Sequence, residues 1–240
     1  MASDAPALKI VGLSASYGGV PAITDIALTV GRGEIVTMIG ANGAGKSTVI
    51  KCVCGLLRPT AGSVNLFGEE VRGLPPDHLV RRGMSVVPEG RRLFGEMSLR
   101  ENLELGAYTR HDPAAVRRDM ERVLGLFPDL RERLSTLVGR FSGGQQQMVA
   151  IARALMSDPR IMLLDEPTIG LAPVIVERIS QLVLDIAKDG VDILIVEQNA
   201  EVALAVANRA YIVEGGCVVT EGDCASIARS EQVQKCYLGI

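Results

Sequence analysis

The sequence contains no tryptophan, and its aromatic side chains are limited to four phenylalanines and four tyrosines among 240 residues. Proteins that bind single-stranded nucleic acid usually stack bases on aromatic rings, so this composition argues against that class. A formal net charge of −3 gives no support for binding to nucleic acid or to an anionic membrane surface either. We therefore expect no nucleic-acid partner.

Long apolar runs and a targeting segment are also missing. Residues Met1 to Ala7 contain no basic stretch followed by an apolar one, so no signal peptide is predicted. The best apolar run, Ile161 to Leu164, is far too short to cross a bilayer. We expect a protein that is soluble by itself and that reaches a membrane only through a partner.

The five cysteines are an odd number without a secretory signal, which predicts reduced thiols in the cytoplasm. Cys52 and Cys54 could form half of a metal site. However, two thiols two positions apart on a helix point to different faces, and no matching Cys/His pair follows. We favour the interpretation that they are buried apolar side chains.

The sequence does contain a clear alternation of strand-like and helix-like segments. A chain of this length with 48% hydrophobic residues can bury the core of one large α/β domain. The middle of the chain is instead helical and rich in charge. Expected strands are 8–13, 22–30, 34–39, 161–164, 191–196, 211–213 and 218–220, and expected helices start near residues 46, 98, 113, 142, 173 and 200.

One segment fits the phosphate-loop pattern G-x-x-x-x-G-K-[ST]. Its glycines let backbone N–H groups approach phosphate oxygens, and the helix that follows adds its positive end. Lys46 should reach the β- and γ-phosphates of ATP, and the Ser47 hydroxyl should bind Mg²⁺. The alternative is a chance glycine-rich turn, which the strand before and the helix after disfavour. The predicted nucleotide-binding residues are Gly40, Ala41, Asn42, Gly43, Ala44, Gly45, Lys46, Ser47 and Thr48.

Two carboxylates, Asp165 and Glu166, follow the apolar segment that starts at Ile161. In phosphoryl transfer one acid holds Mg²⁺ and another polarises the attacking water. Asp165 suits the first role and Glu166 the second, because consecutive side chains diverge at a strand end. Alone, such a pair usually marks a solvated turn, but together with a phosphate loop it predicts a catalytic pair.

The segment Ser142-Gly-Gly-Gln145 starts the long helix expected after residue 142. It can be interpreted as a helix N-cap with a flexible approach, or as a phosphate-binding surface at a helix N-terminus. Both interpretations can hold together. The predicted nucleotide-contacting residues here are Ser142, Gly143, Gly144 and Gln145.

These three motifs, in this order, resemble the ABC ATPase family over nearly the whole chain. The resemblance implies a P-loop NTPase cassette with a RecA-like core, an N-terminal antiparallel β subdomain and a helical insert. It is expected to be a single domain, 1–240, with 1–89 and 159–240 forming the core and 90–158 the helical part. It also implies that two cassettes pair head to tail, so that Ser142–Gln145 of one closes over the γ-phosphate held by the other. Tyr17 stands where the family has an aromatic residue that stacks on adenine; the alternative is a loop-edge aromatic.

Four segments are similar to the F-type ATPase subunit of branched-chain amino-acid importers: 87–94, 97–103, 169–173 and 196–199. That likeness implies a paralogous ATPase as dimer partner, with a homodimer as the alternative. It further implies integral membrane permeases, a periplasmic binding protein as an indirect partner, and a location on the cytoplasmic face of the inner membrane. Leucine, isoleucine or valine is the implied cargo, with amides, urea or aromatic acids as variants.

The chain departs from the wider ABC pattern at two positions. Glu89 replaces the usual glutamine that senses Mg²⁺ and water, so Glu89 is expected near the metal. Gln198 replaces the usual switch histidine and is expected to contact the γ-phosphate. An amide can donate a hydrogen bond, but it cannot carry a proton as histidine can.

Two other functions compete with transport. Non-transport ABC ATPases generally carry long coiled-coil or zinc-bearing inserts, or two cassettes in one chain, whereas this acidic chain has one phosphate loop and a compact insert. A P-loop small-molecule kinase would have no purpose for Ser142–Gln145. We therefore expect a transport ATPase.

Overall fold

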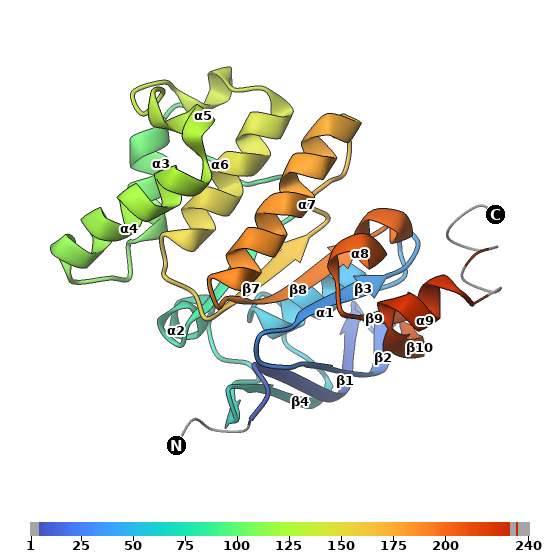
Figure 1. Cartoon of the computed structure of the whole chain (residues 1–240). Coiled ribbons are helices and arrows are strands. Elements are labelled where there is room, and N and C mark those ends of the chain that lie inside the picture. The colour runs from blue at the N-terminus through green and yellow to red at the C-terminus, as the bar shows by residue number, and fades with distance from the viewer. Residues whose placement is uncertain (1–4, 231–233, 235–240) are drawn as a thin grey trace.

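The computed structural model describes residues 5–230 and residue 234, and its strands form two sheets (Figure 1). The larger sheet has the order β10-β9-β3-β8-β7-β6 and is parallel except for β10, which runs antiparallel to β9. Its strands are β3 (Ile35–Ile39), β6 (Met84–Val87), β7 (Ile161–Asp165), β8 (Asp192–Glu197), β9 (Arg209–Glu214) and β10 (Cys217–Asp223).

The three central strands are buried along their whole length, which explains why they are apolar runs rather than alternating ones. Every residue of β3, β7 and β8 is buried. Along β7, Ile161 and Leu163 belong to the core shared with the second sheet, whereas Met162 and Leu164 belong to the core shared with helices on the other face. A parallel sheet covered on both faces requires this pattern.

The second sheet is antiparallel, with the order β2-β1-β4-β5. Its strands are β1 (Leu8–Tyr17), β2 (Val20–Val30), β4 (Ala61–Leu66) and β5 (Glu69–Glu70). The expected antiparallel pair at the N-terminus is confirmed, although β1 extends four residues beyond the predicted end at residue 13. Gly18 and Gly19, with φ of 55° and 86°, form the turn between β1 and β2, as expected for a two-residue hairpin.

Helices fall into two groups. One group lies close to the strands: α1 (Lys46–Val53), α2 (Pro76–Arg81), α7 (Pro173–Lys188), α8 (Ala200–Val206) and α9 (Cys224–Ala228). The other lies together at one side of the molecule (Figure 1): α3 (Leu99–Gly106), α4 (Pro113–Leu126), α5 (Pro128–Arg131), α6 (Gly143–Leu155) and the 3-10 turn η1 (Val138–Arg140). The confirmed capping box of Ser98 and Glu101 starts α3, and Asp112 caps α4 ahead of Pro113.

Cys52 and Cys54 are buried free thiols on and just after α1, in agreement with the apolar interpretation. Between residues 5 and 230, and at 234, no group of three His, Cys, Asp or Glu side chains is arranged to hold a metal ion. Within those same residues, no helix has the length and apolar character needed to cross a membrane.

Candidate functional site

The phosphate loop connects the end of β3 to the start of α1 and folds back around its own lysine. Gly45 has a φ of 103°, and a Cβ there would lie 2.7 Å from Cγ2 of Ile23, so only glycine fits. Lys46 Nζ donates hydrogen bonds to the carbonyl oxygens of Gly40 at 2.7 Å and Ala41 at 3.1 Å. Lys46 is only 4% exposed, so its charge is held at a fixed position inside the loop.

The carboxylates at the end of β7 meet the phosphate loop. Glu166 Oε1 lies 3.2 Å from Lys46 Nζ, and the Ser47 hydroxyl donates to Asp165 Oδ1 at 3.1 Å. The pKa of Asp165 is raised to about 6, chiefly by burial and also by the charges of Glu166 and Glu89, while the Ser47 hydrogen bond and the charge of Lys46 oppose the shift. The structure therefore joins the loop and the acidic pair that the sequence suggested separately.

A cavity of about 690 Å³ opens over the phosphate loop. Glu89 lines it from the loop after β6, and Glu166 lines it from the end of β7. Its remaining lining residues are Pro21, Ala22, Asn42, Gly43, Gly45, Lys46, Ser47, Thr48, Ile169, Gly215 and Gly216. Ser142–Gln145 and Tyr17 are not among these lining residues, all of which are described.

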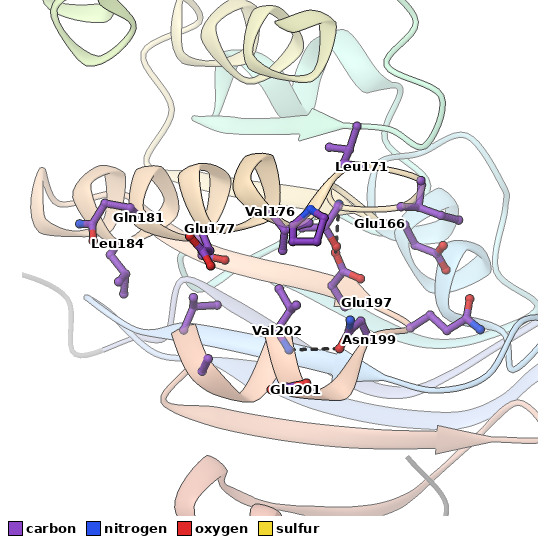
Figure 2. A pocket seen from close by; sticks show the side chains of 18 residues that line it. Glu166, Leu171, Val176, Glu177, Gln181, Leu184, Glu197, Asn199, Glu201 and Val202 are labelled. Carbon is purple, nitrogen blue, oxygen red and sulfur yellow. Dashed lines mark hydrogen bonds between the residues drawn. The ribbon is translucent and has the colours of Figure 1, made fainter. Parts of the chain in front are cut away.

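Glu166 also lines a second cavity, of about 1020 Å³, between α7 and α8. Figure 2 shows Glu166, Glu197 and Asn199 at one end of this cavity and Gln181 and Leu184 at the other. Gln198 is exposed, and it lines the same cavity. Gln198 and Glu166 therefore face one shared space at the carboxyl ends of β7 and β8.

The segment Ser142–Gln145 forms a complete capping box at the start of α6. The Gln145 N–H donates to Ser142 Oγ at 3.3 Å, and the Ser142 N–H donates to Gln145 Oε1 at 3.0 Å. Ser142 and Gly143 are exposed, whereas Gly144 is buried against Ile175 of α7. The N-terminus of α6 thus points an exposed, glycine-lined surface out of the molecule.

Tyr17 ends β1 and is 46% exposed, with Lys51 Nζ 6.0 Å from the centre of its ring. This exposure leaves the ring accessible on the side of the molecule that carries α1.

Sequence reasoning missed two buried polar residues. Glu197 is 3% exposed and accepts hydrogen bonds from Thr168. Nothing in the sequence signalled this burial, because an acidic residue after an apolar run usually marks a solvated turn. Asn102 is fully buried, and its Nδ2 donates to the Phe94 and Ser98 carbonyl oxygens, both at 3.0 Å. The one signal in the sequence for the burial of Asn102 is its position in a predicted amphipathic helix.

Comparison with known families agrees with this geometry. A model of the ABC transporter family matches residues 23–169, and the chain belongs to that family. It is accordingly an ATP-binding cassette ATPase, and the predicted fold class is confirmed.

Three curated relatives cover nearly the whole chain. BraG of Pseudomonas aeruginosa, a high-affinity branched-chain amino acid transport ATP-binding protein, is 45% identical over 95% of this chain and 97% of its own length. LivF of Archaeoglobus fulgidus, a probable branched-chain amino acid transport ATP-binding protein, is 34% identical over 97% of this chain and 99% of its own length. LptB of Escherichia coli strain K12, a lipopolysaccharide export ATP-binding protein, is 35% identical over 97% of each.

Two solved structures share the fold. The ADP conformation of MJ1267, an ATP-binding cassette of an ABC transporter, superposes with a TM-score of 0.87 at 25% identity, over 98% of this chain and all of that one. A dimeric post-hydrolysis state of the cassette MJ0796, bound to ADP and phosphate, has a TM-score of 0.80 at 28% identity, over 90% of this chain and 98% of that one.

Proposed function

We propose that this chain is the ATP-hydrolysing subunit of an ABC importer for branched-chain or related amino acids. The observation that carries the ATPase part is the buried contact of Lys46 with Glu166, beside the hydrogen bond of Ser47 to Asp165. These contacts bring a phosphate-binding cation, a hydroxyl and two carboxylates together, and Lys46, Ser47 and Glu166 line one open cavity.

Each residue then has a distinct task. Lys46 and the N–H groups of residues 40–48 hold the phosphates, and Tyr17 stacks on adenine. Glu166 accepts a proton from the attacking water, and the Gln198 amide hydrogen-bonds the γ-phosphate. When ATP enters, its phosphates replace Glu166 as the partner of Lys46, which frees the Glu166 carboxylate to act as a base.

The donor set fits Mg²⁺ brought with the nucleotide. This ion is usually bound by one or two protein carboxylates together with substrate phosphates, and it does not need a closed protein cage. Ser47 and Asp165 already share a hydrogen bond and would hold the ion, and Glu89 faces the same cavity. A bound Mg²⁺ would supply positive charge to the β- and γ-phosphate oxygens.

A second cassette would complete the site. In one chain Ser142–Gln145 do not line the cavity over the phosphate loop, yet the N-terminus of α6 is exposed and suited to anions. We infer a head-to-tail dimer in which this segment of one cassette covers ATP bound to the other. ATP would close the dimer and hydrolysis would reopen it, which drives the permeases. The partner is a paralogous cassette or a second copy of this chain.

The importer assignment depends on similarity. BraG, at 45% identity, supports branched-chain amino acids, whereas LptB, at 35%, belongs to an exporter. The membrane partners would be permeases on the cytoplasmic face of the inner membrane, with a periplasmic binding protein that delivers cargo.

Copurification tests the transport assignment. The tagged chain would be isolated from its native membranes in mild detergent, and the accompanying proteins identified by mass spectrometry. Permeases and a second cassette, together with leucine uptake that is lost on deletion of the gene, are expected. Lipopolysaccharide-export components, or unchanged uptake, would contradict the importer assignment.

A further inference from the structure

A buried carboxylate connects the two loops that carry the proposed catalytic groups. Glu197 is the last residue of β8 and is 3% exposed. Its Oε1 atom accepts two hydrogen bonds from Thr168, one from the backbone N–H at 3.1 Å and one from the hydroxyl at 2.6 Å. Figure 2 shows Glu197 between α7 and α8 with the dashed bond toward the α7 side.

The hydrogen bonds of Glu197 reach the loop that carries Glu166, and Gln198 directly follows Glu197 in the chain. Thr168 follows Glu166 by two residues, with Pro167 between them, so fixing Thr168 restricts Glu166 from its C-terminal side. Burial and the charge of Glu166 raise the pKa of Glu197, whereas the two hydrogen bonds from Thr168 lower it. One carboxylate therefore joins the Glu166 loop to the chain segment that carries Gln198.

Glu166 needs such support because its backbone is strained. Its φ is 49°, in the left-handed region that is unfavourable for a residue with a side chain. Its N–H donates to the Val196 carbonyl oxygen at 2.8 Å. The end of β8 therefore holds Glu166 at two points: the Val196 carbonyl binds the Glu166 N–H, and the Glu197 carboxylate binds Thr168, two residues further on.

A purely structural role does not explain a carboxylate at this position. A buried acid is costly to desolvate, and an apolar pair of similar shape would stabilise the fold about as well. A hydrogen-bonded carboxylate, in contrast, fixes both the distance and the orientation of the Thr168 groups that donate to it.

We propose that Glu197 is a positioning residue for ATP hydrolysis, which through Thr168 sets Glu166 relative to Gln198, the residue that directly follows Glu197. This inference rests on the roles proposed above for those two residues.

The test removes one hydroxyl. Thr168→Val deletes the 2.6 Å hydrogen bond with little change of shape, and Thr168→Ser keeps it. We expect Thr168→Val to lower kcat by about 10-fold with the KM for ATP changed less than about 3-fold, because a misplaced base affects the chemical step. Thr168→Ser should stay within about 3-fold of wild type in both constants.

A matched control separates positioning from stability. Thr37 of β3 is also buried, and its hydroxyl donates to the Ile195 carbonyl oxygen at 3.3 Å and not to Glu197. Thr37→Val should lower the Tm but leave kcat unchanged. Equal losses of kcat in the two valine variants would overturn the proposal.

The Glu166→Gln background gives the second readout. If Thr168 acts through Glu166, adding Thr168→Val to Glu166→Gln should lower kcat less than about 2-fold further. A full additional 10-fold loss would refute the positioning role. Near-normal ATP turnover of Glu166→Gln alone would remove the proposed catalytic role of Glu166, and this inference with it. If Glu166→Gln is slow but Thr168→Val has a normal kcat, only the positioning role of Glu197 is overturned.

Discussion

Replacing Lys46 by alanine should affect both nucleotide binding and the fold, and the structure separates the two effects. With ATP, the variant loses charge-assisted contacts to two phosphates, each worth about 1.5–3 kcal/mol. The sum of about 3–6 kcal/mol corresponds to a Kd raised by about 10² to 10⁴. Without ATP, Glu166 loses the ammonium group 3.2 Å away and stays buried, which typically costs about 3–5 kcal/mol of unfolding free energy.

Titration calorimetry with ATP and urea unfolding of the nucleotide-free protein would measure the two effects. Lys9→Ala, which removes an exposed lysine on β1, is the matched control and should change neither quantity. Adding Glu166→Gln to Lys46→Ala should restore part of the lost stability, because the buried charge is then neutral. An unchanged ATP affinity in Lys46→Ala would refute the assignment of the phosphate loop.

Three further predictions concern single residues. Glu166→Gln should cut ATP turnover by about 10² or more while ATP still binds; steady-state kinetics with bound-nucleotide analysis checks this, and near-normal turnover would mean that another group positions the water. Gln198→Ala should lower kcat by about 10-fold while Gln198→His stays active, and an alanine variant with wild-type turnover would leave only a role at the start of α8. Asn102→Ala should reduce the unfolding free energy by about 1–3 kcal/mol, since it removes the hydrogen bonds of a buried side chain to the N–H and carbonyl of Phe94, and an unchanged urea midpoint would contradict that explanation.

The sequence predicted the central sheet well where local pattern and tertiary role agree. The apolar runs at β3, β7 and β8 have no alternation, which is the pattern of strands covered on both faces. The phosphate loop was equally clear, because its glycines are required locally and by close neighbours such as Ile23. In contrast, β6 (Met84–Val87) was not anticipated, because four residues give too short a pattern.

The missed residues show what local patterns do not contain. The expected strand 191–196 ended one residue early and left Glu197 out, whereas β8 includes it and buries it. Its partner Thr168 is 29 positions away, and no local rule connects them. Similarly, the capping box at Ser142 was predictable from spacing, but the packing of Gly144 on Ile175 depends on α7.

The central claim is that ATP is hydrolysed at a site shared between two cassettes, and a mixing experiment tests it most directly. Gly143→Asp is a suitable partner variant. Gly143 is exposed, the atoms nearest to an added Cβ are those of the Arg91 guanidinium at 3.4 Å and beyond, and a carboxylate is favourable at a helix N-terminus. The same charge would repel ATP phosphates held by the other cassette.

The measurement is the ATPase rate of Glu166→Gln and Gly143→Asp, each alone and mixed in equal amounts. Each variant alone should be almost inactive, because both sites of its dimer carry the defect. Random mixing makes about half of the dimers mixed, each with one intact composite site, so about a quarter of the wild-type rate should return. A mixture no more active than the average of the two variants would contradict a site shared between two copies of this chain.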